Sequence, residues 1–592
     1  MMIPDNRPFI LLDDARDSGD AAPARLYRYP VETVTAFDPH ELDKVLDRVA
    51  AAQGAGLHAA GYMSYEAGLI LEERLAGRLR SGRACPLAWF GLFEDYDLLD
   101  PEAVAMHLPD AKGAWLGKIR PGITRQDYDK AFASVQDYIV GGDIYQANLT
   151  FRAHAAYAGH PLALYTAIRS RAKAGYGGVV FDGQNWVLSF SPELFFALKE
   201  KRVTAKPMKG TAARLPDNIA DASMQAELQS DPKQRAENLM IVDLLRNDLS
   251  RLAEPGSVKV QKLFQVESYP TIHQMTSTVT AKLAEDHGAV DLLRQIYPCG
   301  SITGAPKIRA MEIIDELEKD QRGIYCGSIG RIDADGDAAF NVAIRTFFLG
   351  KGQETLSIGL GSGVVADSVV DDEWRECLAK GKFAAVNEGA DYRIMDLMET
   401  MAFIPESGIV RLEAHLERMK ASAAALEFEF DRHAARNAIQ AITFHQDQPA
   451  KVRLMLARSG AIAIELQPMP EPLVEPVPVK LTPMLANSHD YRLRHKTSDR
   501  SIYDAPAIHE GAHPIFHDPE GYLTEGAIWN IFVERGEKLL TPPLARGVLP
   551  GILRAELLAS GKAVECDLRA GDLNNGLYVG NSLRGLMKAR LV

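Results

Sequence analysis

A change of pattern near residues 386–394 (VNEGADYRI) constrains this chain more than any other feature. Residues 371–386, just before it, are typical of a helix, and a Gly-containing break follows. Beyond the break a new unit opens as a strand, a turn and a helix that begins near Leu412. A chain of 592 residues is long enough for roughly two to four domains. We therefore predict a first unit over residues 1–390 and a second over residues 391–592.

Strand-like runs and helices follow one another in no regular order. The first unit contains the runs GGVVF, WVLSF and TLSIGLGSGVV, and a helix is predicted over residues 234–253, ended by Pro255 and Gly256. This irregular order favours an α+β fold over repeated βαβ units. In the second unit a Pro-rich break at residues 469–483 is expected to join two lobes.

Composition describes an ordinary globular protein and excludes some partners. Hydrophobic residues make up 46% of the chain and charged residues 24%, and the formal charge is −13. An acidic surface repels phosphate backbones and anionic lipid, so neither nucleic acid nor a membrane surface is expected as a partner. Five scattered cysteines form no CxxC pair, no apolar run is long enough to span a bilayer, and the N-terminus does not resemble a signal peptide. A cytoplasmic protein is expected.

Polar residues of the first unit gather where strands or helices meet loops. Two small-residue loops, CGSITGAPK (299–307) and GLGSGVVADS (359–368), offer backbone N–H groups that can hold a carboxylate. Glu373 and Glu376 lie three residues apart, so both carboxylates share one helix face. The other polar candidates are Gln146, Asn148, Glu193, Lys209 and Glu237.

Three of these glutamates, Glu237, Glu373 and Glu376, suit a hard cation such as Mg²⁺, which prefers oxygen ligands. The alternative is that each is an ordinary solvated residue, with Glu376 paired to Lys380 one helical turn away. Lys209 has the same two interpretations. A nucleophilic lysine requires desolvation or a neighbouring cation, and otherwise the side chain is a surface ammonium.

Together, these clusters resemble in order and in sequence those of the chorismate-utilising enzymes. This is the family of anthranilate synthase component I, aminodeoxychorismate synthase component I and isochorismate synthase. The resemblance covers residues 115–385, the expected chorismate-binding core. FILLDDAR and GYMSYEAG (61–68) look like the extra lobe of the aminodeoxychorismate branch. The fold that this resemblance implies is α+β, with a β-sandwich core and outer helices.

One position indicates the branch of the family. Lys209, in KPMKGTAAR, stands where anthranilate synthases typically carry Ala in a PIAGT-like motif, and the YQANLT wording also resembles the aminodeoxychorismate branch. The resemblance implies that Lys209 attacks C2 of chorismate while Glu193 protonates the departing C4 hydroxyl. Ammonia then enters at C4 and expels the lysine.

The resemblance also implies roles for further residues. Glu237 and Glu376, with Glu373 in support, are expected to hold Mg²⁺. The expected substrate-binding residues are Arg345, Ser301, Thr303, Gly361 and Gly363. His273, in TIHQM, matches an active-site histidine of the family, and no role is assigned to it.

A glutaminase site is missing from the sequence. Such a site needs a Cys nucleophile with His and Glu partners, and none of the five cysteines lies in a glycine-flanked elbow of that kind. Ammonia is therefore expected from solution or from a separate glutamine amidotransferase subunit.

The second unit carries the parts of a different chemistry. Lys496 lies among cations in YRLRHKTSDRSIYD, a setting that can depress an amine pKa. Glu525 lies at a Gly-flanked strand end, and GVLPGILRAELL is a loop that enters a helix, the kind of N-terminus that binds phosphate. A reactive lysine, a carboxylate and a phosphate site are what pyridoxal phosphate (PLP) requires. A surface lysine and an ordinary turn are the alternative.

The wording of this half resembles the fold-type IV PLP enzymes, a two-lobed family that includes aminotransferases and aminodeoxychorismate lyase. METM (398–401), RLEAHLERMKAS (411–422), LTEG…WNIF, GVLPGILR and GNSLRG (580–585) occur in family order. The resemblance implies that Lys496 binds PLP covalently, that Glu525 pairs with the pyridine nitrogen and that a homodimer forms. The residues expected at the PLP phosphate are Arg418, Ile552, Leu553 and Ser582. HKTSDR and NSLRG look more like the lyase, which makes Arg500 and Arg584 candidates for substrate contacts.

One departure from the family concerns folding. The segment lacks most of the strand pair that precedes the METM-like motif, and we expect the preceding domain to supply a substitute.

The two halves make consecutive chemical sense. The first is expected to convert chorismate to 4-amino-4-deoxychorismate, and the second to eliminate pyruvate from it, giving 4-aminobenzoate for folate. Two alternatives stay open. One is an anthranilate synthase-like enzyme fused to an amino-acid aminotransferase, and the other is that one half is a non-catalytic docking scaffold.

Overall fold

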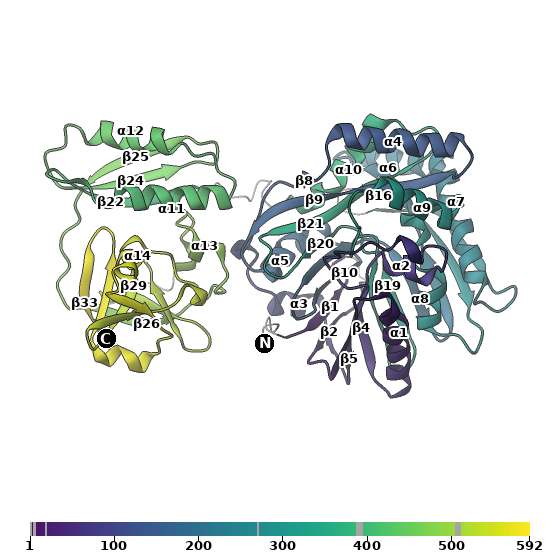
Figure 1. The fold of residues 1–592 in the computed structure, drawn as a ribbon, viewed down its shortest axis with the longest axis horizontal. Coiled ribbons are helices and arrows are strands. Elements are labelled where there is room, and N and C mark those ends of the chain that lie inside the picture. Colours follow the sequence, from purple (N-terminus) through teal and green to yellow (C-terminus); the bar gives the residue numbers. More distant parts are fainter. Residues whose placement is uncertain (1–2, 4–6, 18–20, 269–271, 386–394, 504–510) are drawn as a thin grey trace. The chain divides into compact units, whose positions relative to one another are not determined.

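The chain folds into two compact units (Figure 1). The computed structural model describes residues 3, 7–17, 21–268, 272–385, 395–503 and 511–592. The first unit comprises Met1–Leu108, Lys118–Ala155 and Tyr165–Ala385, and the second comprises Pro109–Gly117, Ala156–Leu164 and Val386–Val592. The predicted break at residues 386–394 lies outside the described residues. In the part of the chain that is described, no helix has the length and apolar character needed to cross a bilayer.

Two large sheets form the first unit. The first sheet has the order β17 (Gly304–Ala305), β9 (Gln146–Ala158), β21 (Thr355–Val364), β20 (Thr346–Leu349), β11 (Trp186–Ser191), β10 (Tyr176–Phe181), β1 (Phe9–Asp13), β2 (Ala24–Arg28) and β6 (Asp97–Leu99), with β8 (Arg120–Pro121) paired to β9. The short strand β7 (Trp115–Leu116), which belongs to the second unit, pairs with the last residues of β9. The second sheet has the order β14 (Met208–Ala213), β16 (Ile272–Lys282), β13 (Arg202–Lys206), β12 (Leu194–Lys199), β19 (Ala338–Asn341), β18 (Ser328–Ile332), β4 (His58–Met63), β5 (Ala88–Phe93) and β3 (Glu32–Ala36), with β15 (Lys259–Ser268) paired to β16.

The two sheets pack face to face through alternate residues of their strands. Ile10 and Val180 of the first sheet share one buried cluster with Tyr62 and Trp89 of the second. Met63, the neighbour of Tyr62, belongs instead to the cluster on the outer face of the second sheet. Since successive side chains of a strand point to opposite faces, this alternation is what a two-layered core requires.

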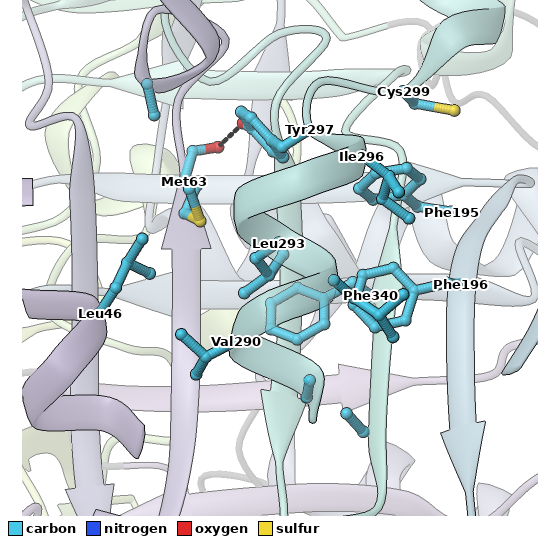
Figure 2. Packing of buried hydrophobic residues seen from close by; sticks show 14 of the residues in the cluster. Leu46, Met63, Phe195, Phe196, Val290, Leu293, Ile296, Tyr297, Cys299 and Phe340 are labelled. Carbon is cyan, nitrogen blue, oxygen red and sulfur yellow. Dashed lines mark hydrogen bonds between the residues drawn. The ribbon is translucent and has the colours of Figure 1, made fainter. Parts of the chain in front are cut away.

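Helices cover the outer face of the second sheet. Figure 2 shows Val290, Leu293 and Ile296 of α8 (Ala289–Ile296) packed with aromatic rings of the sheet, which their spacing along one helix face explains. At the end of α8, the Tyr297 hydroxyl donates a hydrogen bond of 2.8 Å to the carbonyl of Met63. The other helices of this layer are α1 (Pro39–Gly54), α7 (Pro232–Ser250) and α9 (Lys307–Leu317). The expected β-sandwich with outer helices is confirmed.

The predicted helices of the first unit shift at their ends. The helix expected over residues 234–253 is α7, which begins at Pro232 because Asp231 caps the N–H of Gln234. The helix expected over 371–386 is α10 (Val370–Lys380), which stops before Gly381. The remaining helices that precede residue 386 are α2 (Ala67–Leu71), α3 (Pro101–His107), α4 (Arg125–Val140), α5 (Pro161–Ala172) and α6 (Asn218–Ser230).

The second unit has the two lobes that were expected. One lobe is a sheet of β23 (Gly408–Ile409), β22 (Leu397–Ile404), β24 (Ala450–Leu456) and β25 (Ile462–Pro468), with α11 (Leu412–Ala425) and α12 (Arg432–Thr443). The other is a sheet of β28 (Leu523–Gly526), β27 (His513–His517), β26 (Val477–Pro483), β33 (Gly585–Leu591), β32 (Leu577–Asn581), β29 (Asn530–Arg535), β30 (Lys538–Thr541) and β31 (Ala563–Glu565), with α13 (Tyr491–Arg494) and α14 (Ile552–Ala559). The break predicted over 469–483 is shorter, because residues 477–483 form β26 between β27 and β33.

Two short segments from early in the chain complete the second unit. Trp115 of β7 is 1% exposed and lies in the same buried cluster as Met401, Leu416 and Tyr491. The Arg458 guanidinium lies 5.5 Å from the centre of its ring. The second unit is therefore not built from the C-terminal half of the chain alone.

Trp115→Ala is expected to loosen the second unit selectively. Removing a fully buried aromatic side chain costs about 3 kcal/mol, so amides of β22 and β24 should exchange hydrogen faster. Trp374→Ala, which alters an aromatic cluster with Tyr128 and Phe151 in the first unit, is the control and should leave those amides unchanged. Wild-type exchange in β22 and β24 of the Trp115 variant would contradict this account.

Candidate active sites

The first candidate site surrounds Lys209 on β14. Its Nζ lies 3.1 Å from Oε2 of Glu237 on α7, and both side chains are largely buried. Burial raises the carboxyl pKa of Glu376 on α10, but Lys380 lowers it more, and Lys209 is close enough to contribute to the lowered pKa. Three predicted site residues from three distant segments are thus brought together.

Glu193, just before β12, is set up to carry a proton near neutral pH. The residue is 3% exposed, and burial raises the pKa of its carboxyl to about 7. Ser301 donates a hydrogen bond of 2.7 Å to Glu193 Oε1, and the charges of Lys209 and Lys380 also hold the pKa down. A buried carboxyl that titrates near 7 is suited to general acid catalysis.

Strands β9 and β21 close the space around the Lys209 amine. A Cβ on Gly363 would lie 2.4 Å from Lys209 Nζ, so a larger residue there would displace the amine. Gln146 lies beside it and is fully buried, yet its amide nitrogen and oxygen have no hydrogen-bond partner among the described residues. Buried polar groups are normally paired, so this amide is available to a substrate or to ammonia. Gln146 was noted in the sequence without a role.

Other predicted substrate residues make contacts within the protein. The Gly361 carbonyl accepts a hydrogen bond of 2.9 Å from Lys380, and a Cβ on Gly361 would lie 2.7 Å from the carbonyl of Leu149. The Thr303 hydroxyl bonds to the carbonyl of Gly300 within its own turn. Arg345 has its guanidinium 6.0 Å from the ring centre of Phe383. The substrate-binding roles of these residues stay predictions.

His273 is buried on β16 with both ring nitrogens engaged. Nε2 lies 2.9 Å from Asp221 Oδ1, and Nδ1 lies 2.8 Å from the Ser268 hydroxyl. Asp221 also accepts from Arg214 and from the Leu215 amide. These contacts tie β16 to α6, and the assignment of His273 to the active site stays a prediction.

The three expected Mg²⁺ ligands are separately paired. Glu237 is paired with Lys209, Glu373 accepts from the Ser368 hydroxyl at 2.7 Å, and Glu376 is paired with Lys380 at 2.7 Å. Within the ranges that the structure describes, the one cluster with ligand atoms close enough to share a metal is elsewhere, at Asp38, His40 and Glu41. The carboxylate oxygens near Lys209 are nonetheless the kind of ligand that Mg²⁺ prefers, so their chemistry fits this cation.

The second candidate site surrounds Lys496, just after α13. The pKa of its amine is lowered to about 8, chiefly by burial and also by the cations Arg418, Arg500 and Arg453. The carboxylate of Glu399 acts in the opposite direction. The sequence attributed the low pKa to neighbouring cations, whereas burial is the larger cause.

Glu525 on β28 is held by two hydrogen bonds. The Tyr503 hydroxyl donates to Oε1 at 2.5 Å, and the Leu549 amide donates to Oε2 at 2.9 Å. The residue is 2% exposed, and burial raises the pKa of its carboxyl to about 7. A ring nitrogen that shared its proton with this carboxylate would relieve that cost of burial.

The expected phosphate-binding residues converge from both lobes. Helix α14 begins at Ile552, so the first N–H groups of the helix, including that of Leu553, lack partners inside it. Arg418 on α11 donates to the Pro550 carbonyl at 3.0 Å, close to this helix start. Ser582 lies 2.8 Å from His415 Nε2. A helix start with an arginine and a hydroxyl fits a phosphate, and so fits PLP.

Two predicted substrate residues lie differently. Arg500 stacks over the Tyr503 ring at 4.2 Å and bonds to the Ala527 carbonyl, near Glu525. Arg584 donates to the Glu471 carbonyl at 2.8 Å, in the stretch that joins the lobes. Arg500 is therefore placed beside the site, while Arg584 contacts the linker.

Comparison with known proteins agrees with this arrangement. Residues 7–386 match the family described as chorismate binding enzyme. The chain belongs to the chorismate binding enzyme family. Residues 396–592 match a second family, amino-transferase class IV, so the chain joins enzyme domains of two kinds.

Named relatives resemble the first part of this chorismate binding enzyme. Aminodeoxychorismate synthase component 1 of Klebsiella aerogenes is 39% identical over 341 residues, which cover 54% of this chain and 75% of the relative. The protein of that name from Salmonella typhimurium is 38% identical over 377 residues, covering 59% and 82%. The crystal structure of anthranilate synthase component I from Streptococcus pneumoniae aligns with a TM-score of 0.54 at 26% identity, covering 63% of this chain and 93% of the other.

The buried acid makes stability depend on pH in a defined direction. With a pKa raised from 4.5 to about 7, folded Glu193 keeps its proton where the unfolded chain has lost it, so stability falls as pH rises through this window. Each pH unit is worth about 1.4 kcal/mol, so Glu193→Gln should stabilise the first unit by about 3 kcal/mol at pH 8. At pH 5 the gain should be small, as measured by thermal unfolding.

Glu254→Gln is the matched control, because that carboxylate is exposed and paired with Lys282. Its effect should not change between pH 5 and pH 8. An equal effect of Glu193→Gln at both pH values would contradict the raised pKa.

Proposed function

We propose that this chain converts chorismate and ammonia to 4-amino-4-deoxychorismate and then converts that product to 4-aminobenzoate and pyruvate. The observation that carries the first step is the buried Lys209 beside Glu193, a carboxyl that titrates near pH 7. The names of the relatives support it. The class IV half with its buried Lys496 supports the second step.

In the first step Lys209 and Glu193 act as nucleophile and acid. The Lys209 amine forms a bond to C2 of chorismate, both ring double bonds shift by one position, and the C4 hydroxyl leaves as water with the proton of Glu193. Ammonia then bonds to C4, both double bonds shift back, and the C2–Nζ bond breaks to release Lys209. One water is lost for each ammonia gained. Gln146, with an unpaired amide beside Lys209, is placed to bind the incoming ammonia.

Mg²⁺ fits the same site. Glu237 and Glu376, with Glu373 in support, would hold it, and it would neutralise a substrate carboxylate. The family membership supports this cation, because chorismate-utilising enzymes usually use Mg²⁺. Bound there, Mg²⁺ would compete with Lys209 for the carboxylate of Glu237.

In the second step Lys496 is the base. Bound PLP would supply an electron sink, and Arg418, Ser582 and the start of α14 would hold its phosphate. The Lys496 amine takes the proton from C4 of aminodeoxychorismate, the C3–O bond breaks, and the ring becomes aromatic. The released enolpyruvate takes up a proton and becomes pyruvate. A pKa near 8 keeps a useful fraction of this amine neutral at pH 7.

Ammonia is proposed to come from a separate glutaminase subunit. The relatives are named component 1, which implies a further component. All five cysteines are free, four of them are buried, and burial raises the pKa of Cys85, Cys299, Cys326 and Cys377. A raised pKa disfavours the thiolate that a glutaminase needs.

Lys496→Ala should stop the pathway midway. With chorismate, ammonium, Mg²⁺ and PLP, this variant is expected to accumulate 4-amino-4-deoxychorismate and form no 4-aminobenzoate, as measured by liquid chromatography and mass spectrometry. Lys209→Ala should form neither, because no amine attacks C2. Anthranilate formed by the wild-type chain, or 4-aminobenzoate formed by Lys496→Ala, would contradict the proposal.

Gly363→Ala tests the geometry of the first site. The new methyl group would overlap Lys209 Nζ, and because the lysine end is flexible the fold should tolerate it. Formation of aminodeoxychorismate should fall about 100-fold, the cost expected for displacing a reacting group by an ångström. Gly77→Ala, which meets nothing within 4 Å, is the control and should match the wild type. Wild-type activity of the Gly363 variant would contradict the position of the amine.

A further inference from the structure

A carboxylate lies buried in the second unit where none was assigned a role. Glu399 on β22 is 1% exposed, in a strand that is otherwise apolar apart from Thr400. Nearby positive charges hold the pKa of Glu399 down to about 2, chiefly that of Arg418. A buried charge of this kind is costly unless it is fully paired, so its partners show what it does.

The partners of Glu399 lie on α11 and lead to the phosphate end of the site. Arg418 donates to both oxygens, from Nε at 2.8 Å and from Nη2 at 2.6 Å. His415, one turn earlier on the same helix, lies 2.6 Å from Oε2 through Nδ1. The other nitrogen of His415 contacts the Ser582 hydroxyl on the opposite lobe, at 2.8 Å. One carboxylate therefore fixes two of the groups that would hold the cofactor phosphate.

The same strand contacts the reactive lysine. The Met398 amide donates to the Lys496 carbonyl at 2.9 Å, and Leu397 forms an isolated bridge with Thr497. The Glu399 charge is the strongest influence that raises the Lys496 pKa. Arg418, Arg500 and Arg453 act in the opposite direction and lower the Lys496 pKa. His415 is also close enough to interact electrostatically with Lys496.

We propose that Glu399 is a positioning residue of the PLP site, which orients Arg418 and the His415–Ser582 pair toward the phosphate and supplies the negative charge beside Lys496. This inference rests on the proposed PLP chemistry of the second unit. Without Glu399 the Arg418 side chain, 11% exposed, would lose both hydrogen bonds to the carboxylate and its fixed orientation.

The test is the binding of PLP to the full chain carrying Glu399→Gln. Loss of the charge-assisted bonds should weaken PLP binding about tenfold. Loss of the negative charge should lower, by about one unit, the pH midpoint at which the absorption of bound PLP changes. Both are read by spectroscopic titration, without any turnover. Glu399→Asp, which keeps the charge and shortens the reach, should keep the pH midpoint and still bind PLP less well.

Glu413→Gln is the matched control, since it removes an exposed carboxylate on α11 that two arginines contact. It should match the wild type in both measurements. If Glu399→Gln does not fold, His415→Gln serves instead, with weaker PLP binding and an unchanged midpoint as the expected result. Wild-type affinity in the folded variant would overturn the inference. The wild-type chain should show an absorption band of bound PLP that Lys496→Ala removes. Absence of this band from the wild type would overturn the PLP function as well.

Discussion

The burial of ionisable groups is the constraint on which both sites depend. Removing a carboxyl or an amine from water disfavours its charged form. This effect raises the pKa of Glu193 and Glu525 to about 7 and is the largest cause that lowers the pKa of Lys496 to about 8. Each group is thereby poised to exchange a proton near neutrality. Glu399 is buried as well, but it stays ionised because Arg418 and His415 form hydrogen bonds with its carboxylate and lower its pKa.

The fold serves this burial by closing strands and helices over the polar groups. In the first unit, β21 lies beside β9 and places Gly363 where only a hydrogen leaves room for the Lys209 amine. In the second unit, the site lies where α11 and β22 meet Ser582, just after β32, and the segment that carries Lys496. In both units, strands of a sheet form one side of the site, and a loop or the start of a helix supplies polar groups. A small number of polar groups in a preformed site is common where small molecules bind.

Residue chemistry and sequence motifs were enough to predict the sandwich and the two lobes. They also singled out Lys209, Glu193, Lys496 and Glu525, whose catalytic roles stay predictions. What the sequence could not show depends on contacts between distant segments. Glu399 lies in the quoted METM motif, but its proposed role depends on His415 of α11, which joins it to Ser582 in a distant segment. The sequence around Trp115 does not show that this residue packs in the second unit, because a tryptophan's neighbours in sequence do not identify the core in which it is buried. The pairing of Glu376 with Lys380, by contrast, was one of the two interpretations that the spacing allowed.

The central claim is that one chain carries a nitrogen atom from ammonia into 4-aminobenzoate through two consecutive reactions. The most direct test supplies the purified chain with chorismate, ¹⁵N-ammonium, Mg²⁺ and PLP, and follows the products by mass spectrometry. The account predicts ¹⁵N-labelled 4-aminobenzoate and pyruvate in equal amounts, after a transient labelled aminodeoxychorismate. Label in anthranilate, or labelled aminodeoxychorismate that never proceeds to 4-aminobenzoate, would contradict it.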